Sequence, residues 1–158
     1  MIRAIAAVDK ELGIAKNGRI PWKLPTDEQY FTDQTKKYGG VTLTGWRTFQ
    51  TFHGPLEDRV NYIVTPDPSP IPGVFVVNDL DKFFEELKTD LWVVGGGMVF
   101  KETLDRTDEL YITHVDGVFG CDTFFPAFED KFELASKQAP ITENGLTFYY
   151  AIYRRKQN

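Results

Sequence analysis

The chain alternates short apolar runs with polar segments that suit helices and loops. The apolar runs that predict strands in the first two-thirds of the chain are 2–8, 41–44, 60–64, 74–77 and 91–94. The segments predicted to be helical are 26–37, a short turn after Gly45, 79–87 and 98–104. Because Leu91–Val94 is apolar without alternation, we expect that strand to be buried on both faces.

After Glu109 the pattern changes to consecutive strands, predicted at 110–115, 132–138 and 146–153. The turn-forming residues Glu143-Asn144-Gly145 indicate that the last two strands form a hairpin. Alternating strands and helices followed by an antiparallel end predict an α/β fold. We expect a single domain over 1–158, with a mostly parallel central sheet covered by helices and an antiparallel C-terminal hairpin. Ligands then bind at the carboxyl ends of the parallel strands.

Composition narrows the classes of function. The 158 residues, 42% of them hydrophobic, are enough for one substantial core. The net charge of −5 and the scattered basic residues argue against a nucleic-acid surface. The apolar start runs directly into charged residues, so we expect a buried strand and no signal peptide or membrane span. Lone Cys121 fits a reducing compartment, and two distant histidines give no metal site. We expect a cytoplasmic monomer acting on a small molecule.

One carboxylate has unusual neighbours. Asp27 follows Pro21 and Pro25, and these prolines allow a helix to begin only at or after Pro25. An acid in a first helical turn can simply cap the helix. However, Ile20, Trp22, Leu24 and Phe31 make the surroundings of Asp27 apolar, which raises a carboxyl pKa and allows it to hold a cationic or protonatable ligand.

Two glycine junctions join strands to helices. The first is Gly45-Trp46-Arg47-Thr48 and the second is Gly95-Gly96-Gly97. Backbone N–H groups at such junctions can bind phosphate, so two of them on one sheet suit a dinucleotide. Neither is a GxGxxG motif, so this is no ordinary Rossmann site. Backbone packing alone is the other explanation for the three glycines.

Taken together, these segments resemble the dihydrofolate reductase family over essentially the whole chain. The matching segments are 13–22, 24–27, 45–48, 55–59, 94–97, 110–114 and 122–126. The resemblance implies hydride transfer from reduced nicotinamide C4 to C6 of a dihydropterin, with a proton added at N5, giving tetrahydrofolate. It therefore implies an NADPH-dependent oxidoreductase of one-carbon metabolism.

The resemblance also implies roles for individual residues. Asp27 grips the pterin and promotes its protonation, Trp22 orders a water, Thr113 bonds the carboxylate, and Tyr111 lies beneath the pterin and nicotinamide. The substrate-binding residues it implies are Ile5, Ile20, Asp27, Phe31, Phe52, Leu56, Val94 and Thr113, with Arg59 clamping the glutamate tail. The cofactor-binding residues it implies are Ala7, Ile14, Gly18, Gly45, Trp46, Arg47, Thr48, Thr65, Gly95, Gly96, Gly97, Met98, Val99 and Phe100.

Several positions depart from the family pattern. Trp46 and Met98 stand where members carry basic residues, so binding of the 2′-phosphate depends mainly on Arg47 and Thr65. NADPH is the expected cofactor, with NADH as an alternative. Glu28 stands beside Asp27 where many members are apolar. Two other functions remain open: a reductase of the same fold that acts on a ribitylamino-pyrimidine, and a nucleotide-binding protein without turnover.

Overall fold

The computed structural model describes residues 1–157 and centres on one twisted sheet. Within these residues the sheet has nine strands in the order β10-β11-β7-β1-β6-β3-β4-β5, with β9 also pairing with β11. Its strands are β1 (Ile2–Val8), β3 (Val41–Gly45), β4 (Val60–Val64), β5 (Phe75–Val77), β6 (Leu91–Gly95), β7 (Glu109–Val115), β9 (Phe132–Lys137), β10 (Ile141–Glu143) and β11 (Leu146–Arg155). Strands β7, β1, β6, β3, β4 and β5 run parallel, and β11 pairs antiparallel with β7.

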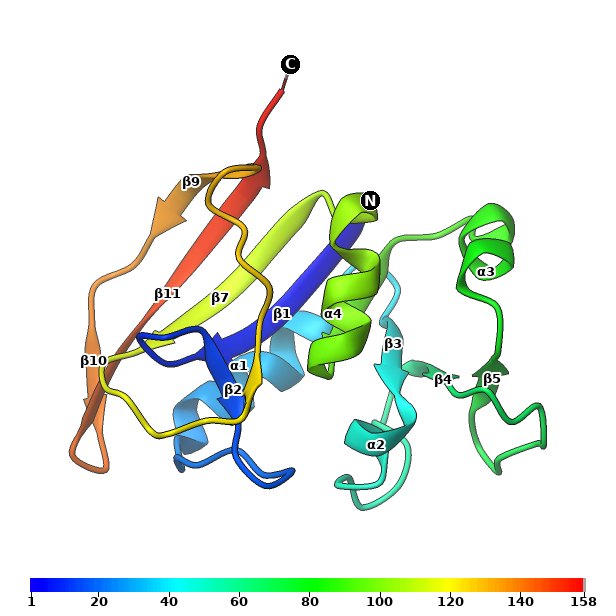
Figure 1. Cartoon of the computed structure of the whole chain (residues 1–158), viewed down its shortest axis with the longest axis horizontal. Helices are drawn as coiled ribbons and strands as arrows, with labels where there is room; N and C mark the ends of the chain where they lie inside the picture. Colours follow the sequence, from blue (N-terminus) through cyan, green and yellow to red (C-terminus); the bar gives the residue numbers. More distant parts are fainter. Residues whose placement is uncertain (158) are drawn as a thin grey trace.

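Helices lie on both faces of this sheet. Figure 1 shows α4 (Gly97–Thr103) in front of the sheet and α1 (Pro25–Thr35) behind it. The short α2 (Trp46–Phe49) lies at the lower edge, where β3 ends, and α3 (Leu80–Glu86) lies beside β5. A 3₁₀ turn, Leu104–Arg106, continues α4. The carboxyl ends of the parallel strands therefore meet at the edge that α2 and the loop before α1 share.

This architecture confirms the predicted fold class and corrects three details. Helix α1 begins at Pro25, whose missing N–H is not needed in a first helical turn, and it ends at Thr35 rather than Lys37. The predicted hairpin turn is correct, but the strand before it is β10, which was not predicted; β9 pairs with the other part of β11. A second sheet, β2 (Gly13–Ala15) with β8 (Thr123–Phe124), replaces part of an expected loop. These short strands carry too few residues for their alternation to be recognised.

The middle strands are buried because they have cover on both faces. On one face, Val8, Leu43 and Val93 belong to a core that α4 completes through Phe100. On the other face, Ile5, Trp92 and Tyr111 form a smaller cluster, against which α1 packs Tyr30 and Phe31. This explains the uninterrupted apolar sequence of β6 and places α1 directly over β1 and β7.

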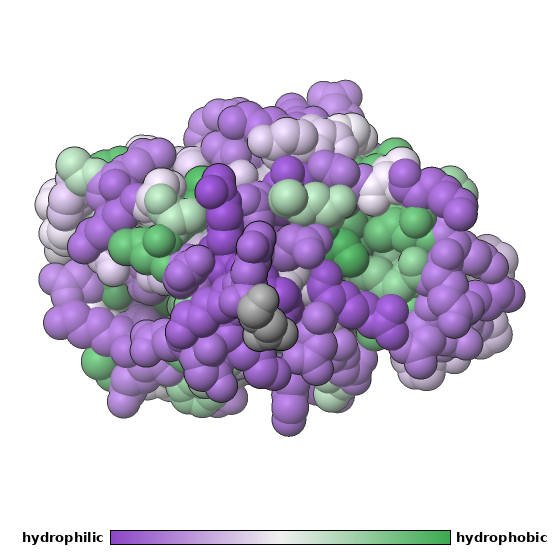
Figure 2. Space-filling view, turned by 90° about the horizontal axis from the view of Figure 1, so that it is seen from above, coloured by the Kyte–Doolittle hydropathy of each residue, from purple (hydrophilic) through white to green (hydrophobic). Residues whose placement is uncertain are grey.

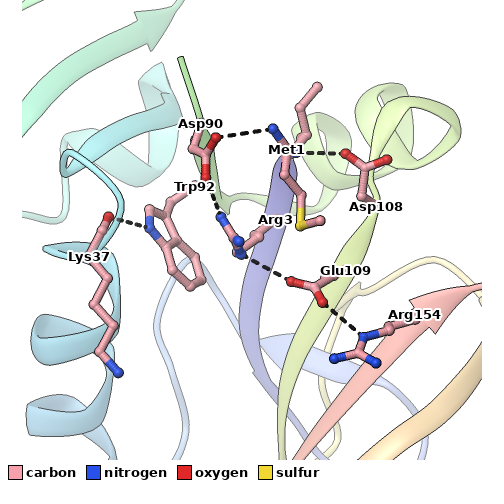
Figure 3. A network of polar contacts seen from close by, with 9 residues as sticks. Met1, Arg3, Lys37, Asp90, Trp92, Asp108, Glu109 and Arg154 are labelled. Atoms are coloured by element: carbon pink, nitrogen blue, oxygen red, sulfur yellow. Dashed lines mark hydrogen bonds and ion pairs between the residues drawn. The ribbon is translucent and has the colours of Figure 1, made fainter.

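Charged side chains join the strands at the opposite end, where the parallel strands begin. Arg3 is only 7% exposed, and its guanidinium donates to Asp90 at 2.9 Å and to Glu109 at 3.0 Å (Figure 3). Asp90 also accepts from the N-terminal amine at 3.2 Å, and Glu109 accepts from Arg154 at 3.1 Å. The face seen in Figure 2, from the side where the N-terminus lies, is mainly hydrophilic. The network thus ties together the beginnings of β1, β6 and β7 and the end of β11.

We expect Glu109→Gln to destabilise the protein by about 2 kcal/mol, because it replaces one of the two carboxylate partners of the buried Arg3 guanidinium with a neutral amide. Arg154→Ala removes the partner on the exposed side of Glu109 and is expected to cost less than about 1 kcal/mol. Urea unfolding monitored by tryptophan fluorescence measures both values. Equal, small losses in the two variants would show that the network does not stabilise the sheet.

Candidate functional site

The Asp27 carboxyl is fixed from the sheet. Its Oδ1 accepts a hydrogen bond from Thr113 Oγ1 at 2.7 Å, and the two residues are 86 positions apart in the chain. Thr113 lies on β7 between Ala7 of β1 and Tyr150 of β11. The helix that carries Asp27 is held over these strands by Tyr30, whose ring stacks on that of Tyr150 with centroids 3.8 Å apart. The structure therefore brings Asp27 and Thr113 together, with Ala7 next to Thr113 on the neighbouring strand.

Burial changes the acidity of this group. Loss of hydration raises the pKa of Asp27 to about 6. The hydrogen bond from Thr113 opposes this shift, whereas the negative charges of Glu28 and Glu143 add to it. Glu28 itself pairs with Lys23 at 3.0 Å on the exposed side of the helix. A carboxyl that titrates near neutrality can exchange a proton with a bound ligand under physiological conditions.

Two apolar clusters meet at Tyr30 of α1, the helix that carries Asp27. Ile5 and Tyr111 are buried on the sheet, and Phe31 and Val94 pack against them. Trp22 is buried in the other cluster, with its ring edge-on to Phe119 at a centroid distance of 5.1 Å. These five predicted site residues therefore belong to the two clusters that Tyr30 of α1 joins.

Other residues predicted for the substrate lie farther out. Ile20 is 64% exposed on the loop before α1, so its side chain is not part of the buried apolar wall. Phe52 is half-buried beside Phe49, at a centroid distance of 6.3 Å. Leu56 donates its backbone N–H to Asn61 Oδ1 at 2.9 Å, which fixes the loop that leads to Arg59.

Arg59 is held in place by two hydrogen bonds. Its Nη1 donates to Thr35 Oγ1 at 2.9 Å, and its Nε donates to the Glu57 carbonyl at 2.9 Å. Thr35 is fully buried at the end of α1, so the guanidinium is anchored to the same helix that carries Asp27 in its first turn. A guanidinium anchored in this way can present its remaining N–H groups to a carboxylate.

The two glycine junctions lie next to each other, because β3 and β6 are neighbours and Thr44 pairs with Gly95. A Cβ on Gly96 would lie 2.7 Å from Thr48 Oγ1, and one on Gly97 would lie 2.9 Å from Thr123 Cγ2. Each position therefore has no room for a side chain. The peptide between Gly95 and Gly96 is cis. Within residues 1–157 neither α2 nor α4 has a side-chain cap, so N–H groups of their first turns are available to a phosphate.

The remaining residues predicted to bind the cofactor are divided between these junctions and the core. Ile14 lies beside Gly97, and Gly18 is exposed on the loop that follows. Val99 and Phe100 are buried in the main core, so their side chains face the sheet, whereas Met98 is 73% exposed. A hollow of about 140 Å³ lies beyond the first junction, lined by Trp46, Thr65, Asp67, Ser69, Pro70 and Ile71. Arg47 is exposed beside Trp46.

Comparison with known proteins agrees with this geometry. The sequence model of the family described as dihydrofolate reductase matches residues 1–155. The chain belongs to the dihydrofolate reductase family. This confirms the resemblance inferred from the sequence segments.

Members of the dihydrofolate reductase family from distant organisms match along nearly the whole chain. A dihydrofolate reductase of Staphylococcus aureus (strain MSSA476) is 33% identical over 157 residues, covering 96% of this chain and 97% of that protein. The bifunctional dihydrofolate reductase-thymidylate synthase 1 of Arabidopsis thaliana is 30% identical over 176 residues, covering 97% of this chain, which spans only 34% of that longer protein. A solved dihydrofolate reductase from Enterococcus faecalis, complexed with NADP(H) and RAB-propyl, superposes with a TM-score of 0.87. It is 29% identical and the match covers 99% of this chain and 97% of that one.

Sequence reasoning missed two carboxylates, Asp9 and Glu143, that fix backbone segments next to predicted site residues. Asp9 is 3% exposed and accepts backbone N–H bonds from Gly13 at 2.8 Å, Glu11 at 2.9 Å and Phe119 at 3.2 Å. Burial raises its pKa, but these hydrogen bonds outweigh burial and leave the pKa below its usual value. Glu143 accepts two hydrogen bonds from Thr26, at 3.0 and 2.5 Å. The position of Asp9 just after a buried strand could have indicated its role. The role of Glu143 could not be recognised in the sequence, because it depends on a contact between residues 117 positions apart.

The raised pKa of Asp27 means that its charge opposes folding at neutral pH. Folding is most favoured below the pKa of the unfolded carboxyl, and the protein loses stability as pH rises through about 6. We therefore expect Asp27→Asn to be more stable than the wild type by about 2 to 3 kcal/mol at about pH 8, with no gain near pH 4. Urea unfolding at both pH values measures the difference. An equal gain at both would contradict a cost that arises from the ionised form.

Proposed function

We propose that the protein transfers a hydride from NADPH to C6 of 7,8-dihydrofolate while N5 takes up a proton, giving tetrahydrofolate and NADP⁺. The family match over residues 1–155 is the observation that carries the proposal. The solved relative complexed with NADP(H) supports the same cofactor. The reaction reduces one C=N bond, so it needs a hydride at carbon and a proton at nitrogen.

The chain's own residues supply the conditions for protonation. Asp27 faces the pterin from the start of α1, with Thr113 fixing the orientation of its carboxyl at 2.7 Å. A carboxyl with a pKa of about 6 binds the protonatable pterin and raises its proton affinity. The surrounding side chains Ile5, Phe31 and Trp22 exclude bulk water and favour a close approach of donor and acceptor.

The glycine junctions suit the dinucleotide. When bound, the reduced nicotinamide supplies the hydride. N–H groups at Gly45–Thr48 and Gly95–Gly97 would hold the pyrophosphate, and Arg47 and Thr65 would contact the 2′-phosphate. The uncapped starts of α2 and α4 in the described chain support this fit, as does the pairing of Thr44 with Gly95, which sets the two junctions side by side.

Several wider properties are part of the proposal. The chain would act as one domain over 1–158, as a cytoplasmic monomer in one-carbon metabolism. Lone Cys121 fits a reducing compartment. Each helix in the part of the chain described is too short or too polar to cross a bilayer. Residues 1–157 contain no group of three or more His, Cys, Asp or Glu side chains that could hold a metal ion.

Consumption of reduced nicotinamide, followed by its absorbance with dihydrofolate present, tests the proposal directly. We expect turnover with NADPH in the wild type and a loss of at least about a hundredfold at neutral pH in Asp27→Asn, because the variant keeps the volume but not the ionisable group. Parallel assays with NADH show whether Arg47 and Thr65 are enough to give a preference for NADPH.

The same assay separates the alternatives. No turnover with dihydrofolate but turnover with a ribitylamino-pyrimidine would identify the related reductase of the same fold. NADPH binding without consumption of either substrate would identify a non-catalytic nucleotide-binding protein. Wild-type activity in Asp27→Asn would remove the carboxyl from its proposed role.

Arg59 gives a prediction about substrate binding alone. We expect Arg59→Lys to raise KM for dihydrofolate about tenfold with little change in kcat, because an ammonium cannot form a two-point contact with the tail carboxylate. A dihydropterin that lacks the glutamate tail serves as the control substrate and should show no such change. An equal rise in KM for both substrates would instead indicate that the loop at 55–59 has moved.

A further inference from the structure

The start of α1 depends on the C-terminal hairpin. Within the described residues, no side chain of the helix caps its N-terminus; the N-cap position is Leu24 and the first turn begins with Pro25. The N–H of Thr26 would therefore lack an intrahelical acceptor. Glu143 supplies one, because its Oε1 accepts from Thr26 N at 3.0 Å and its Oε2 accepts from Thr26 Oγ1 at 2.5 Å. Asp27 is the next residue of the helix.

The turn of the hairpin fixes the position of Glu143. Strands β10 and β11 pair with Glu143 opposite Leu146, so only Asn144 and Gly145 separate them. Both turn residues have positive φ, at 53° and 74°, as the tight Asn-Gly turn of a two-residue hairpin requires. Asn144 also donates its side-chain amide to the Lys23 carbonyl at 2.9 Å. The turn thus contacts the chain on both sides of Pro25.

We propose that Glu143 is a positioning residue for Asp27, because its carboxylate caps the start of α1 from the C-terminal hairpin and places a second negative charge near the acid. The proposal rests on the proposed function, in which Asp27 promotes protonation of the substrate. Glu143 acts through the helix and its charge. It is not proposed to touch the substrate.

Electrostatics support the proposed effect of the Glu143 charge on Asp27. Hydrogen bonds from Thr26 lower the pKa of Glu143, so its carboxylate is ionised at neutral pH. This charge favours the protonated form of Asp27. The other groups that interact with Asp27 are Glu28 and Tyr30 on its own helix, Thr113 on β7 and Tyr150 on β11; Glu28 is paired with Lys23. Burial raises the pKa of Tyr30 and Tyr150 further above physiological pH, so both phenols are neutral there. Glu28 and Glu143 are therefore the negative charges in the described chain that affect Asp27.

Two variants separate the cap from the charge. Glu143→Gln removes the charge but keeps an oxygen that can accept from the Thr26 N–H, whereas Glu143→Ala removes both. Glu133→Gln is the matched control, because Glu133 is exposed on β9, which pairs with another part of β11. The titration of the Asp27 carboxyl carbon in apoprotein, followed by NMR, reports the charge. Hydrogen exchange of the Thr26 amide reports the cap.

We expect the pKa of Asp27 to fall in both Glu143 variants and to stay unchanged in Glu133→Gln. The Thr26 amide should exchange roughly fivefold faster or more in Glu143→Ala, with most of its protection kept in Glu143→Gln. For turnover of dihydrofolate, kcat should fall roughly three- to tenfold at neutral pH in Glu143→Ala, and the activity of Glu143→Gln should approach that of the wild type at acidic pH.

The outcomes distinguish this proposal from the proposed function. An unchanged Asp27 pKa together with a loss of activity that is the same at every pH would overturn the role of Glu143 and leave only an ordinary contribution to stability. Absence of turnover in the wild type would overturn the proposed function, while the NMR titration and amide exchange would still decide whether Glu143 caps the helix and acts on Asp27.

Discussion

The hydrogen bond between Thr113 and Asp27 joins the helix layer to the sheet at the point where the proposed chemistry takes place. Thr113 can make it because β7 lies between β1 and β11, which fixes the height and direction of its hydroxyl. Asp27 can accept it because two prolines force the helix to begin just before the acid. Much of the remaining structure supports this contact: Tyr30 stacks on Tyr150 of β11, and Phe31 packs over β1 and β7.

The buried charged groups at the two ends of the parallel strands have opposite surroundings. At the amino-terminal edge of the parallel strands, Arg3 is buried but has two carboxylate partners, so burial is compensated by charge-assisted bonds (Figure 3). At the carboxyl edge, Asp27 is buried with one hydroxyl donor and two negative neighbours. That arrangement raises the pKa of Asp27 to about 6, so part of the carboxyl stays protonated near neutral pH. The ionised carboxyl lowers the stability of the fold, and it does so at the position where the proposed ligand binds.

Much of the fold could be predicted from the sequence, and the reasons are local. Apolar runs such as Leu91–Val94 specify buried strands, and Asn144-Gly145 specifies a tight hairpin because both residues accept positive φ. Strands β2, β8 and β10 were missed, since segments of two or three residues show no usable alternation. The glycine junctions were located correctly, but only the structure reveals that they are neighbours and that Thr48 and Thr123 leave no space for a side chain.

The candidate site was less predictable where it depends on contacts between distant segments. Asp27 stands out in sequence because of its apolar neighbours, whereas Glu143 looks like an ordinary turn residue. Its proposed role follows from three facts that no single segment contains: Pro25 leaves the first turn without its own cap, the Asn-Gly turn directs the preceding residue, and β11 lies beside β7. In the proposed mechanism, Asp27, which its sequence neighbours reveal, therefore depends on Glu143, which only the three-dimensional structure reveals. Substitutions in the hairpin should be judged by their effect on α1 as well as on the hairpin itself.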